Sequence, residues 1–411
     1  MPQRLYYDDP FLTEFTANVA DIREHSRGVW QLALDRSAFY PTSGGQPHDT
    51  GTLEATAPSG TRLTAHITNV EEDESGTVWH VTDKPLSAGT AVTGSIDRTR
   101  RIDHMQQHTG QHLLSAAFHR EFNAPTVSFH LGDTTSTIDL ATPALPSNAI
   151  AKIERLTNEI IAEDRPVDFQ TIPRADAEAL LASGALRKLP ERDGPIRLIR
   201  IADFDLNACG GTHVRSTGQI GGLHIRSLEK VRQGTRLEFV CGLRAAAVSR
   251  ADYELLTQSA NTLSVPPTEL PAAIQRLLAE KKSAAKELQS RLEELATYEA
   301  QALIAETPLT ANTRLIQRTF NRDLTALKTL ASKLIGAAPS TIALLTNEAD
   351  PTTIVFASSP NLAIDCGAAF KAALATHNGK GGGSKEMAQG SVPRANLNSC
   401  LADLLNSSRT L

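Results

Sequence analysis

Two short motifs in the chain hold residue types that bind transition metals. The first, HTGQH, runs from His108 to His112, and imidazoles four residues apart lie on one face of a helix. The second, CGGTH, runs from Cys209 to His213, where two glycines let the backbone turn tightly between a thiolate and an imidazole. Three histidine nitrogens and one cysteine sulfur form a set that tetrahedral zinc accepts. The sequence therefore predicts one zinc ion per chain, bound by His108, His112, Cys209 and His213.

The ligand set leaves open what the zinc would do. His104 offers a rival pair with His108, but it lies at the expected start of the helix, so the pair of His108 and His112 is preferred. Thr109 stands where zinc proteases carry a glutamate, so their general base is missing. Four protein ligands saturate the ion, as in structural sites. Catalysis would require that one ligand leaves, that the coordination expands to five, or that zinc only orients substrate and water.

The elements expected around these motifs predict an α+β protein with four domains. Residues 1–97 alternate apolar and polar in short runs, which predicts a β-rich, barrel-like domain. Residues 98–248 mix helices and strands and hold both metal motifs. Residues 249–306 become helical and charged, and a heptad pattern over 274–302 predicts a coiled-coil arm or hairpin, with an amphipathic helix packed on its own chain as the alternative. Residues 307–411 are expected to form a separate α/β domain.

The composition is that of a globular protein. The 411 residues are 40% hydrophobic and 21% charged, and no apolar run approaches the ~18–20 residues of a membrane span. Four cysteines do not make a disulfide scaffold, and the N-terminus lacks the apolar core of a secretory signal. We therefore expect a cytoplasmic protein without a membrane partner. The net charge of −5 excludes coating of nucleic acid by bulk charge but allows local basic patches.

The two metal motifs, in this order, resemble the zinc-binding editing domain shared by alanyl-tRNA and threonyl-tRNA synthetases. The run FYPTSGGQP, from Phe39 to Pro47, is similar to the glycine motif of the alanyl branch. The run GKGGGSKEMAQG, from Gly379 to Gly390, resembles the DHH-associated domain that ends alanyl-tRNA synthetases. These resemblances cover nearly the whole chain and point to the long form of the free-standing AlaX editing proteins. No class II aminoacylation domain precedes the editing region, so ATP-dependent amino-acid activation is not expected.

The resemblance implies a trans-editing hydrolase that deacylates tRNA-Ala mischarged with serine, with glycine left open as a second target, and zinc as its cofactor. An apolar pocket rejects an added hydroxyl only about a hundredfold, so a second site that recognises the hydroxyl improves fidelity. The glycine motif makes Thr42, Gly44, Gly45 and Gln46 candidates for substrate binding. It departs from the synthetases at Pro41-Thr42, where they usually carry Ala-Glu. The alternative for this motif is a hairpin turn with glycine at positive φ.

The strand that follows the zinc helix supplies candidates for catalysis. Alternate residues of a strand share a face, so Thr126, Ser128 and His130 are expected to face one way and to line the pocket. Ser128 is the candidate for recognising the serine hydroxyl, and His130 is a candidate proton shuttle because histidine titrates near neutral pH. A solvated strand face is the alternative.

Contacts with tRNA are expected from locally basic segments. Arg232 and Arg236 lie in a basic segment, 226–250, and Lys380 and Lys385 flank a run of glycines whose backbone N–H groups suit a phosphate. The spacing is not that of a Walker P-loop, so a nucleoside triphosphatase is not expected, and a solvated loop is the alternative. The heptads indicate a homodimer, formed through the helical arm or the C-terminal domain.

Two other functions stay open at this point. The first is a non-catalytic RNA-binding module with a structural zinc, which the saturated ligand set and the basic tail favour. The second is a zinc hydrolase of small molecules, which leaves the arm and the C-terminal domain without a purpose.

Overall fold

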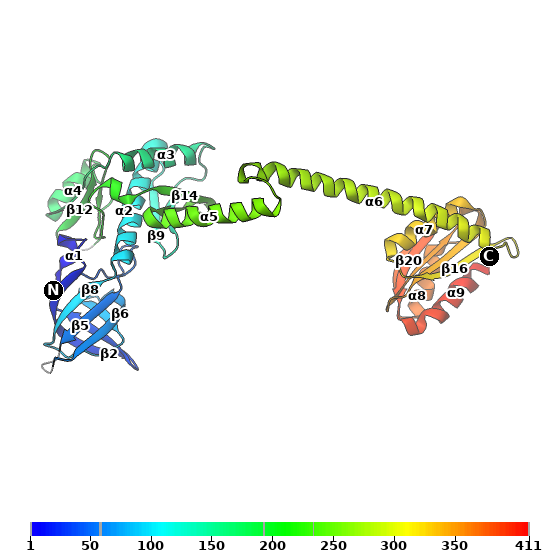
Figure 1. Ribbon diagram of the computed structural model, residues 1–411, viewed down its shortest axis with the longest axis horizontal. Helices are drawn as coiled ribbons and strands as arrows, with labels where there is room; N and C mark the ends of the chain where they lie inside the picture. The colour runs from blue at the N-terminus through cyan, green and yellow to red at the C-terminus, as the bar shows by residue number, and fades with distance from the viewer. Residues whose placement is uncertain (1, 57–59, 192–193, 233, 410–411) are drawn as a thin grey trace. The chain divides into compact units, whose positions relative to one another are not determined.

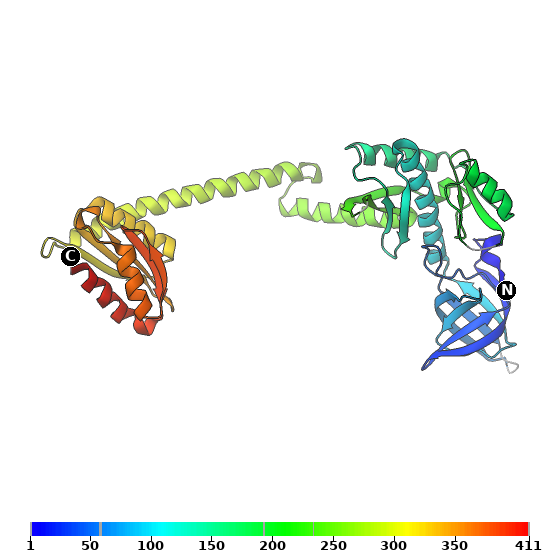
Figure 2. The same cartoon turned by 180° about the vertical axis from the view of Figure 1, so that it is seen from behind.

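The computed structural model contains both helices and strands, and the run of strands from β2 (Glu14–Ser26) to β8 (Ala91–Ile96) is followed by a mixture of helices and strands, as expected for the α+β class (Figures 1 and 2). The structure describes residues 2–56, 60–191, 194–232 and 234–409. The chain divides into two compact units, Met1–Gln258 (unit 1) and Ser259–Leu411 (unit 2). Among the described residues, no helix combines the length and the apolar character that crossing a membrane needs.

Unit 1 begins with a closed six-stranded barrel, in the order β2-β3-β7-β6-β5-β8. Alternation of side chains gives the barrel its apolar interior, since Phe15, Ala17 and Val19 of β2 point into the core while their neighbours are exposed. The barrel expected in this region is confirmed. The elements here are β1 (Gln3–Arg4), α1 (Leu5–Asp8), β2 (Glu14–Ser26), β3 (Val29–Leu34), β4 (Arg36–Ser37), β5 (Gly51–Thr56), β6 (Arg62–Glu72), β7 (Val78–Thr82) and β8 (Ala91–Ile96).

Helix α2 (Arg98–Phe122) is the central element of the rest of unit 1. Asp97 caps its first turn by accepting hydrogen bonds from the backbone N–H groups of Thr99 and Arg100. Every residue from His104 to Phe118 is buried, polar ones included. Buried polar side chains need hydrogen-bond partners, so this helix carries an unusual concentration of groups that must be satisfied by their neighbours.

Two sheets and two helices accompany α2. The four-stranded sheet has the order β14-β15-β10-β9, and the three-stranded sheet has the order β11-β12-β13. The bounds are β9 (Thr126–Leu131), β10 (Ser136–Leu140), α3 (Ala149–Ala162), β11 (Val167–Ile172), α4 (Arg174–Ala182), β12 (Ile196–Ile201), β13 (Asp205–Ala208), η1 (Thr217–Ile220), β14 (Leu223–Val231) and β15 (Gly234–Cys241). The CGGTH motif follows β13 directly.

Helix α5 (Gly242–Thr262) leads into unit 2, whose long helix α6 (Leu270–Glu306) has 37 residues. The five-stranded sheet of unit 2 has the order β16-β17-β18-β20-β19, with β16 and β17 parallel. The remaining elements are η2 (Pro267–Glu269), β16 (Arg314–Phe320), α7 (Leu324–Ala337), β17 (Thr341–Asn347), β18 (Thr352–Ser358), η3 (Pro360–Leu362), α8 (Cys366–Thr376), β19 (Lys380–Gly383), β20 (Met387–Val392), η4 (Arg394–Asn396) and α9 (Leu397–Arg409). The C-terminal α/β elements are as expected.

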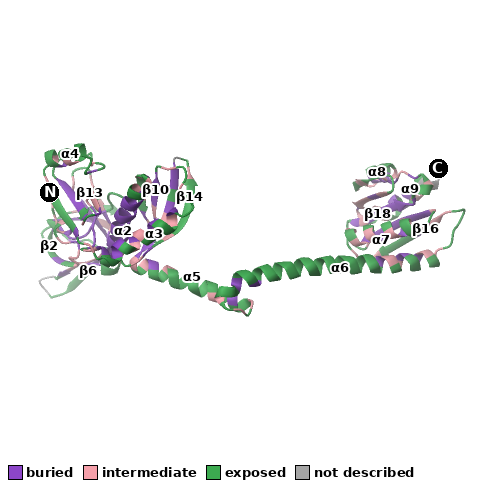
Figure 3. Cartoon of the chain, turned by 90° about the horizontal axis from the view of Figure 1, so that it is seen from above, coloured by how far each residue is buried: buried purple, intermediate pink, exposed green. Residues whose placement is uncertain are grey.

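The heptad positions of the expected arm lie on α6, and Figure 3 colours most of this helix as exposed. Apolar heptad residues such as Leu288 and Leu295 are 61% and 56% exposed. The structure contains one chain, so a coiled coil between chains stays a prediction.

The glycine-rich segment of unit 2 is a strand and not the loop that the sequence predicted, whereas its contact with a phosphate stays a prediction. Residues 380–383 form the edge strand β19, which pairs with β20 in antiparallel fashion. Glycine is required by close packing: a Cβ on Gly381 would lie 2.3 Å from the carbonyl oxygen of Gln389 and 2.9 Å from a methyl group of Leu374. Lys380 and Lys385 are nevertheless exposed, as a contact with a phosphate would require.

Candidate metal centre

The structure brings the four predicted ligands together. One ligand atom from each of His108, His112, Cys209 and His213 lies within 4.8 Å of the others. The Sγ of Cys209 is 3.4 Å from Nε2 of His108 and 3.3 Å from Nε2 of His213. The rings of His108 and His213 have centroids 4.5 Å apart. Among the described residues, His104 is not part of this cluster. Four soft and borderline donors converging on one point form a set that can hold a metal ion.

Two of the imidazoles are held in the tautomer that metal binding needs. Nδ1 of His108 is 2.8 Å from Oε1 of Gln46, an acceptor, so this nitrogen carries the proton and Nε2 keeps its lone pair. Thr109 donates its hydroxyl hydrogen to the carbonyl of Met105 and therefore accepts from Nδ1 of His213, at 3.1 Å. In both rings the free nitrogen is the one beside Cys209. The residues present thus fit a metal ion at this place.

The third imidazole, that of His112, has a more polar surrounding. Its Nδ1 lies 3.2 Å from the side-chain amide nitrogen of Asn207 and 3.8 Å from a carboxylate oxygen of Asp205. Burial acts to lower its pKa, but the nearby carboxylate of Asp205 and the sulfur of Cys209 raise the pKa of His112 to about 9. His112 must therefore release a proton when a metal binds.

Cys209 and His213 are already in the forms that bind a metal. Burial acts to raise the pKa of the Cys209 thiol, but electrostatic interactions with the imidazoles of His108 and His213, 3.4 and 3.3 Å away, hold it well below its ordinary value. Burial lowers the pKa of His213 to about 3. A thiolate and a neutral imidazole are the species that coordinate zinc.

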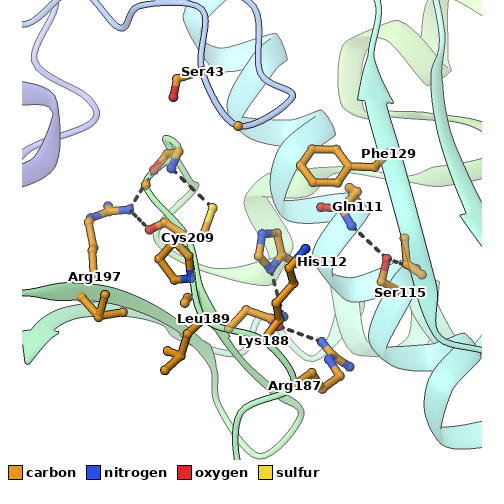
Figure 4. Close-up of a pocket in the computed structure, with 18 of the residues that line it drawn as sticks. Ser43, Gln111, His112, Ser115, Phe129, Arg187, Lys188, Leu189, Arg197 and Cys209 are labelled. Atoms are coloured by element: carbon orange, nitrogen blue, oxygen red, sulfur yellow. Dashed lines mark hydrogen bonds between the residues drawn. The ribbon is translucent and has the colours of Figure 1, made fainter. Parts of the chain in front are cut away.

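A cavity of about 620 Å³ opens beside the cluster, a size typical of small-ligand pockets (Figure 4). Its wall is made by the glycine motif, by α2, by β9, by the loop before β12 and by the turn after β13. His112 and Cys209 both line it, so a metal bound here would face the cavity. Arg187 and Lys188 contribute positive charge to the same wall.

The glycine motif forms a tight turn beside the cavity. The backbone of Ser43 exchanges both hydrogen bonds with Gln46, and the two central residues, Gly44 and Gly45, have φ of 55° and 81°, as a type I′ turn requires. Gly44 lines the cavity, whereas a Cβ on Gly45 would lie 2.6 Å from the ring of Phe129.

The remaining two candidates of this motif point elsewhere. Thr42 is not among the residues that line the cavity, and its hydroxyl is 3.0 Å from Nδ1 of His48. Gln46 is fully buried and contacts a metal-ligand candidate rather than the open cavity. Its Oε1 also accepts from the backbone N–H of Thr212 at 3.0 Å, so it ties the glycine turn to both metal motifs.

The expectation that Thr126, Ser128 and His130 share one strand face is wrong for Thr126. A bulge shifts the register: Leu140 pairs with Thr126 but Asp139 pairs with Ser128, so one extra residue, Val127, turns Thr126 to the other face. Ser128 lines the cavity, but its hydroxyl donates to Asp139 at 2.7 Å.

The outward side of the same strand is exposed. His130 is exposed and is not among the residues that line the cavity. Of the basic candidates in unit 1, Arg232 is exposed, whereas Arg236 forms two hydrogen bonds of 2.7 and 2.9 Å with Asp139. The positive charge of Arg236 is therefore already paired with a carboxylate, which weakens the case for a contact with phosphate.

Arg197 belongs to a basic segment, 187–200, that the sequence offers for tRNA contact, but its role beside the metal motif was not predicted. Only 4% of it is exposed, and its Nη1 donates to the carbonyl oxygens of Cys209 at 3.1 Å and Gly211 at 2.8 Å. Its guanidinium also lies over the rings of Tyr7 and Phe169. A single arginine inside the apolar run IRLI, at the start of β12, was the available signal, because a charge in a buried strand must have a specific partner.

Three family models match the chain. The model "Threonyl and Alanyl tRNA synthetase second additional domain" matches residues 196–237, which include the CGGTH motif. The model "tRNA synthetases class II (A)" matches residues 8–100, the barrel region, and the DHHA1 domain matches residues 312–407 in unit 2.

Curated relatives of two kinds are similar to the chain. The "Alanine--tRNA ligase" proteins of Pyrococcus abyssi and Pyrococcus furiosus are 32% and 33% identical over 94% of the chain, which spans only 42% of their length. The "Alanyl-tRNA editing protein AlaX-L" of Pyrococcus horikoshii is 30% identical over 95% of both chains. Among solved structures, the C-Ala domain of Aquifex aeolicus alanyl-tRNA synthetase matches 25% of this chain and 96% of that one, with 15% identity and a TM-score of 0.23.

Proposed function

The chain belongs to the AlaX family of alanyl-tRNA editing proteins, and from this premise we propose that it hydrolyses the aminoacyl ester of tRNA-Ala mischarged with serine, using one zinc ion. The observation that carries the proposal is the position of the ligand cluster at the wall of a cavity, with His112 and Cys209 facing the space a substrate would enter. A site that served only to stabilise the fold has no need of such an opening.

In this proposal His108, His112, Cys209 and His213 hold the zinc. When bound, zinc supplies a Lewis acid that polarises an ester carbonyl and favours ionisation of water. Gln46 and Thr109 hold two of the imidazoles in the binding tautomer, through the contacts of 2.8 and 3.1 Å. These braces keep the ligands in place while the substrate changes from ester to acid.

Positive charge on the cavity wall also supports binding of the aminoacylated end of a tRNA, whose phosphates are negative. Lys188 is exposed there, and Arg187 shares its positive charge with Asp205 at 2.7 Å. In unit 2, Lys380 and Lys385 are exposed at the sheet edge and are proposed as further phosphate contacts. The exposed heptad residues of α6 support, in addition, a homodimer through this helix.

A second candidate function is a non-catalytic RNA-binding protein with a structural zinc. Its support is the number of ligands, because four protein ligands fill a tetrahedral zinc. In that case the cavity would bind the end of the tRNA without cleaving its ester.

Deacylation of Ser-tRNA-Ala separates the two functions. We expect the zinc-loaded protein to release serine, a chelator to abolish the release, and added zinc to restore it. Ala-tRNA-Ala and a free seryl ester serve as controls, and both should be cleaved far more slowly. Tight binding of Ser-tRNA-Ala without release of serine would support the RNA-binding function, and equal cleavage of the free ester would support a small-molecule hydrolase.

A further inference from the structure

Gln111 lies between the two metal-ligand candidates of α2, one residue before His112, and it lines the cavity. Its side chain is held from one side only: Nε2 donates to the hydroxyl of Ser115 at 2.9 Å. That hydroxyl is itself held by Thr126, whose Oγ1 lies 2.7 Å away. The bulge in β9 that turns Thr126 inward thus helps to fix the orientation of the Gln111 amide.

The other end of this amide has no partner. Among the described residues, Oε1 of Gln111 forms no hydrogen bond, although only 5% of the residue is exposed. Figure 4 shows this oxygen turned away from Ser115, toward the space between Phe129 and Cys209. A buried carbonyl oxygen normally has a hydrogen-bond donor, so a missing donor beside a cavity indicates that the ligand brings it.

We propose that Oε1 of Gln111 accepts a hydrogen bond from the side-chain hydroxyl of the seryl group, and that this residue determines the preference for serine. The inference rests on the proposed function and names the selecting residue. A buried acceptor favours binding of a ligand with an O–H group, whereas the methyl group of alanine and the hydrogen of glycine leave the acceptor unpaired. Ser128, the candidate from the sequence, donates its hydroxyl hydrogen to Asp139 and is exposed, so water can pair with its oxygen and no ligand donor is needed there.

Binding of stable substrate analogues tests this assignment without requiring hydrolysis. The probes are 3′-amino-3′-deoxyadenosine carrying a seryl, alanyl or glycyl group in amide linkage, titrated into the full-length zinc-loaded protein. Wild type should bind the seryl analogue about tenfold or more tightly than the other two. Gln111→Met keeps the length of the side chain but removes the acceptor, so it should abolish this preference while leaving the alanyl and glycyl affinities unchanged.

Ser128→Ala is the matched control, because it removes a hydroxyl from the same cavity wall, and it should leave the preference intact. Zinc content and thermal unfolding of each variant show whether the site is still assembled. The inference is overturned if wild type shows no seryl preference, if Gln111→Met retains it, or if Ser128→Ala is the variant that removes it. It is also overturned if Gln111→Met weakens all three analogues equally, since Gln111 would then contact the ammonium group that they share.

The same experiment distinguishes this inference from the proposed function. If the protein binds the seryl analogue through Gln111 but releases no serine from Ser-tRNA-Ala, the inference about Gln111 is supported and the proposed hydrolase function is rejected. If the protein deacylates Ser-tRNA-Ala and Gln111→Met keeps the preference for the seryl analogue, the proposed hydrolase function is supported and the inference about Gln111 is rejected.

Discussion

Glycine allows different groups to come close in the two units: side chains at the metal centre of unit 1, and strand backbone in the edge strand of unit 2. A Cβ on Gly211 would lie 2.2 Å from Cε1 of His108 and 2.9 Å from Oε1 of Gln46, which are side-chain atoms of the site. A Cβ on Gly383 would lie 2.2 Å from the carbonyl oxygen of Met387 and 2.3 Å from the Cα of Ala388, which are backbone atoms of the neighbouring strand. The absence of a side chain at Gly211 therefore leaves space for functional side chains, whereas at Gly383 it leaves space only for the backbone of the paired strand.

A glycine motif can therefore serve a site or only the packing of a strand, and the groups beside each glycine decide which. The CGGTH segment itself supplies Cys209 and His213, and its Gly211 leaves the space that His108 and Gln46 occupy. The GKGGG segment forms a strand, and the exposed lysines within it and just after it, Lys380 and Lys385, are the groups proposed to contact a ligand. Removing each kind of group separately tests whether chemistry resides in unit 1 and binding in unit 2.

The largest effect is expected from Cys209→Ala. Loss of the thiolate removes one of four ligands, so zinc binding and deacylation should both be abolished. Metal content by mass spectrometry and release of serine from Ser-tRNA-Ala measure the two losses. Cys366→Ala, which removes a buried thiol from unit 2, is the matched control and should keep full zinc. Full zinc in the Cys209→Ala protein would falsify the ligand assignment.

The paired variants Gly211→Ala and Gly383→Ala address the comparison directly. Gly211→Ala pushes against His108 and its brace Gln46, so zinc affinity and deacylation should fall about 10–100-fold. Gly383→Ala should instead lower the free energy of unfolding of unit 2 by about 2 kcal/mol and leave zinc content unchanged. Competition with a zinc chelator and thermal unfolding provide the two readouts. If Gly383→Ala lowered zinc affinity as well, the two units would not be separate in function.

A smaller effect is expected from acidification, and it should act on unit 1. Burial lowers the pKa of His80 in the barrel to about 4, from about 6.5 in the unfolded chain. The folded protein favours the neutral form of His80. The contribution of this preference to the free energy of unfolding is therefore complete above pH 6.5 and is lost as the pH falls from 6.5 to 4. The loss amounts to at most about 3 kcal/mol, since each pKa unit corresponds to about 1.4 kcal/mol.

Denaturant unfolding of the zinc-loaded protein between pH 7.5 and 4 measures this loss. His104, whose pKa burial also lowers to about 4, adds to it. A His80→Gln variant removes one titrating group and should show a shallower dependence of stability on pH. An unchanged slope in this variant would show that His80 does not contribute.

The smallest effect is expected from Lys380→Ala combined with Lys385→Ala. If both lysines neutralise phosphates, affinity for tRNA should fall about two- to tenfold, and the slope of log affinity against log salt should become shallower by about 1–2. Lys328→Ala combined with Lys333→Ala removes the same charge from α7 and is the control. Deacylation at saturating tRNA should be unchanged in both proteins. Equal affinity in the two double variants would mean that the edge of β19 is not a tRNA contact.

The ligands could be found from the sequence because the information is local. The spacing of His108 and His112 is a property of any helix, and Cys209 and His213 lie on one short turn. The braces around them are not local: Gln46 reaches His108 only because the barrel places the glycine turn beside α2, a contact over 62 positions of sequence. Gln46 was recognised as a functional residue through the glycine motif, but its contact with His108 could not be derived.

The errors in strand assignment have a similar origin. A strand alternates faces only while its register holds, and the bulge opposite Thr126 depends on how β10 pairs, which composition does not determine. The glycine run from Gly381 to Gly383 has low strand propensity, so a loop was the natural expectation. Its pairing with β20 and the closeness of α8 override that propensity. The barrel, by contrast, followed from plain alternation over several strands.

The burial of α2 has a consequence for how fast metal can enter or leave the protein. His108 and His112 lie on α2 within the stretch from His104 to Phe118 that is buried throughout, so the backbone that carries them cannot move without disrupting the core of unit 1. Cys209 and His213 lie on a turn outside any helix or strand and are tied down by a few side chains, Arg197 among them. Exchange of the ion with solution should therefore begin at the turn, and its rate should report the opening of that turn rather than unfolding of the domain.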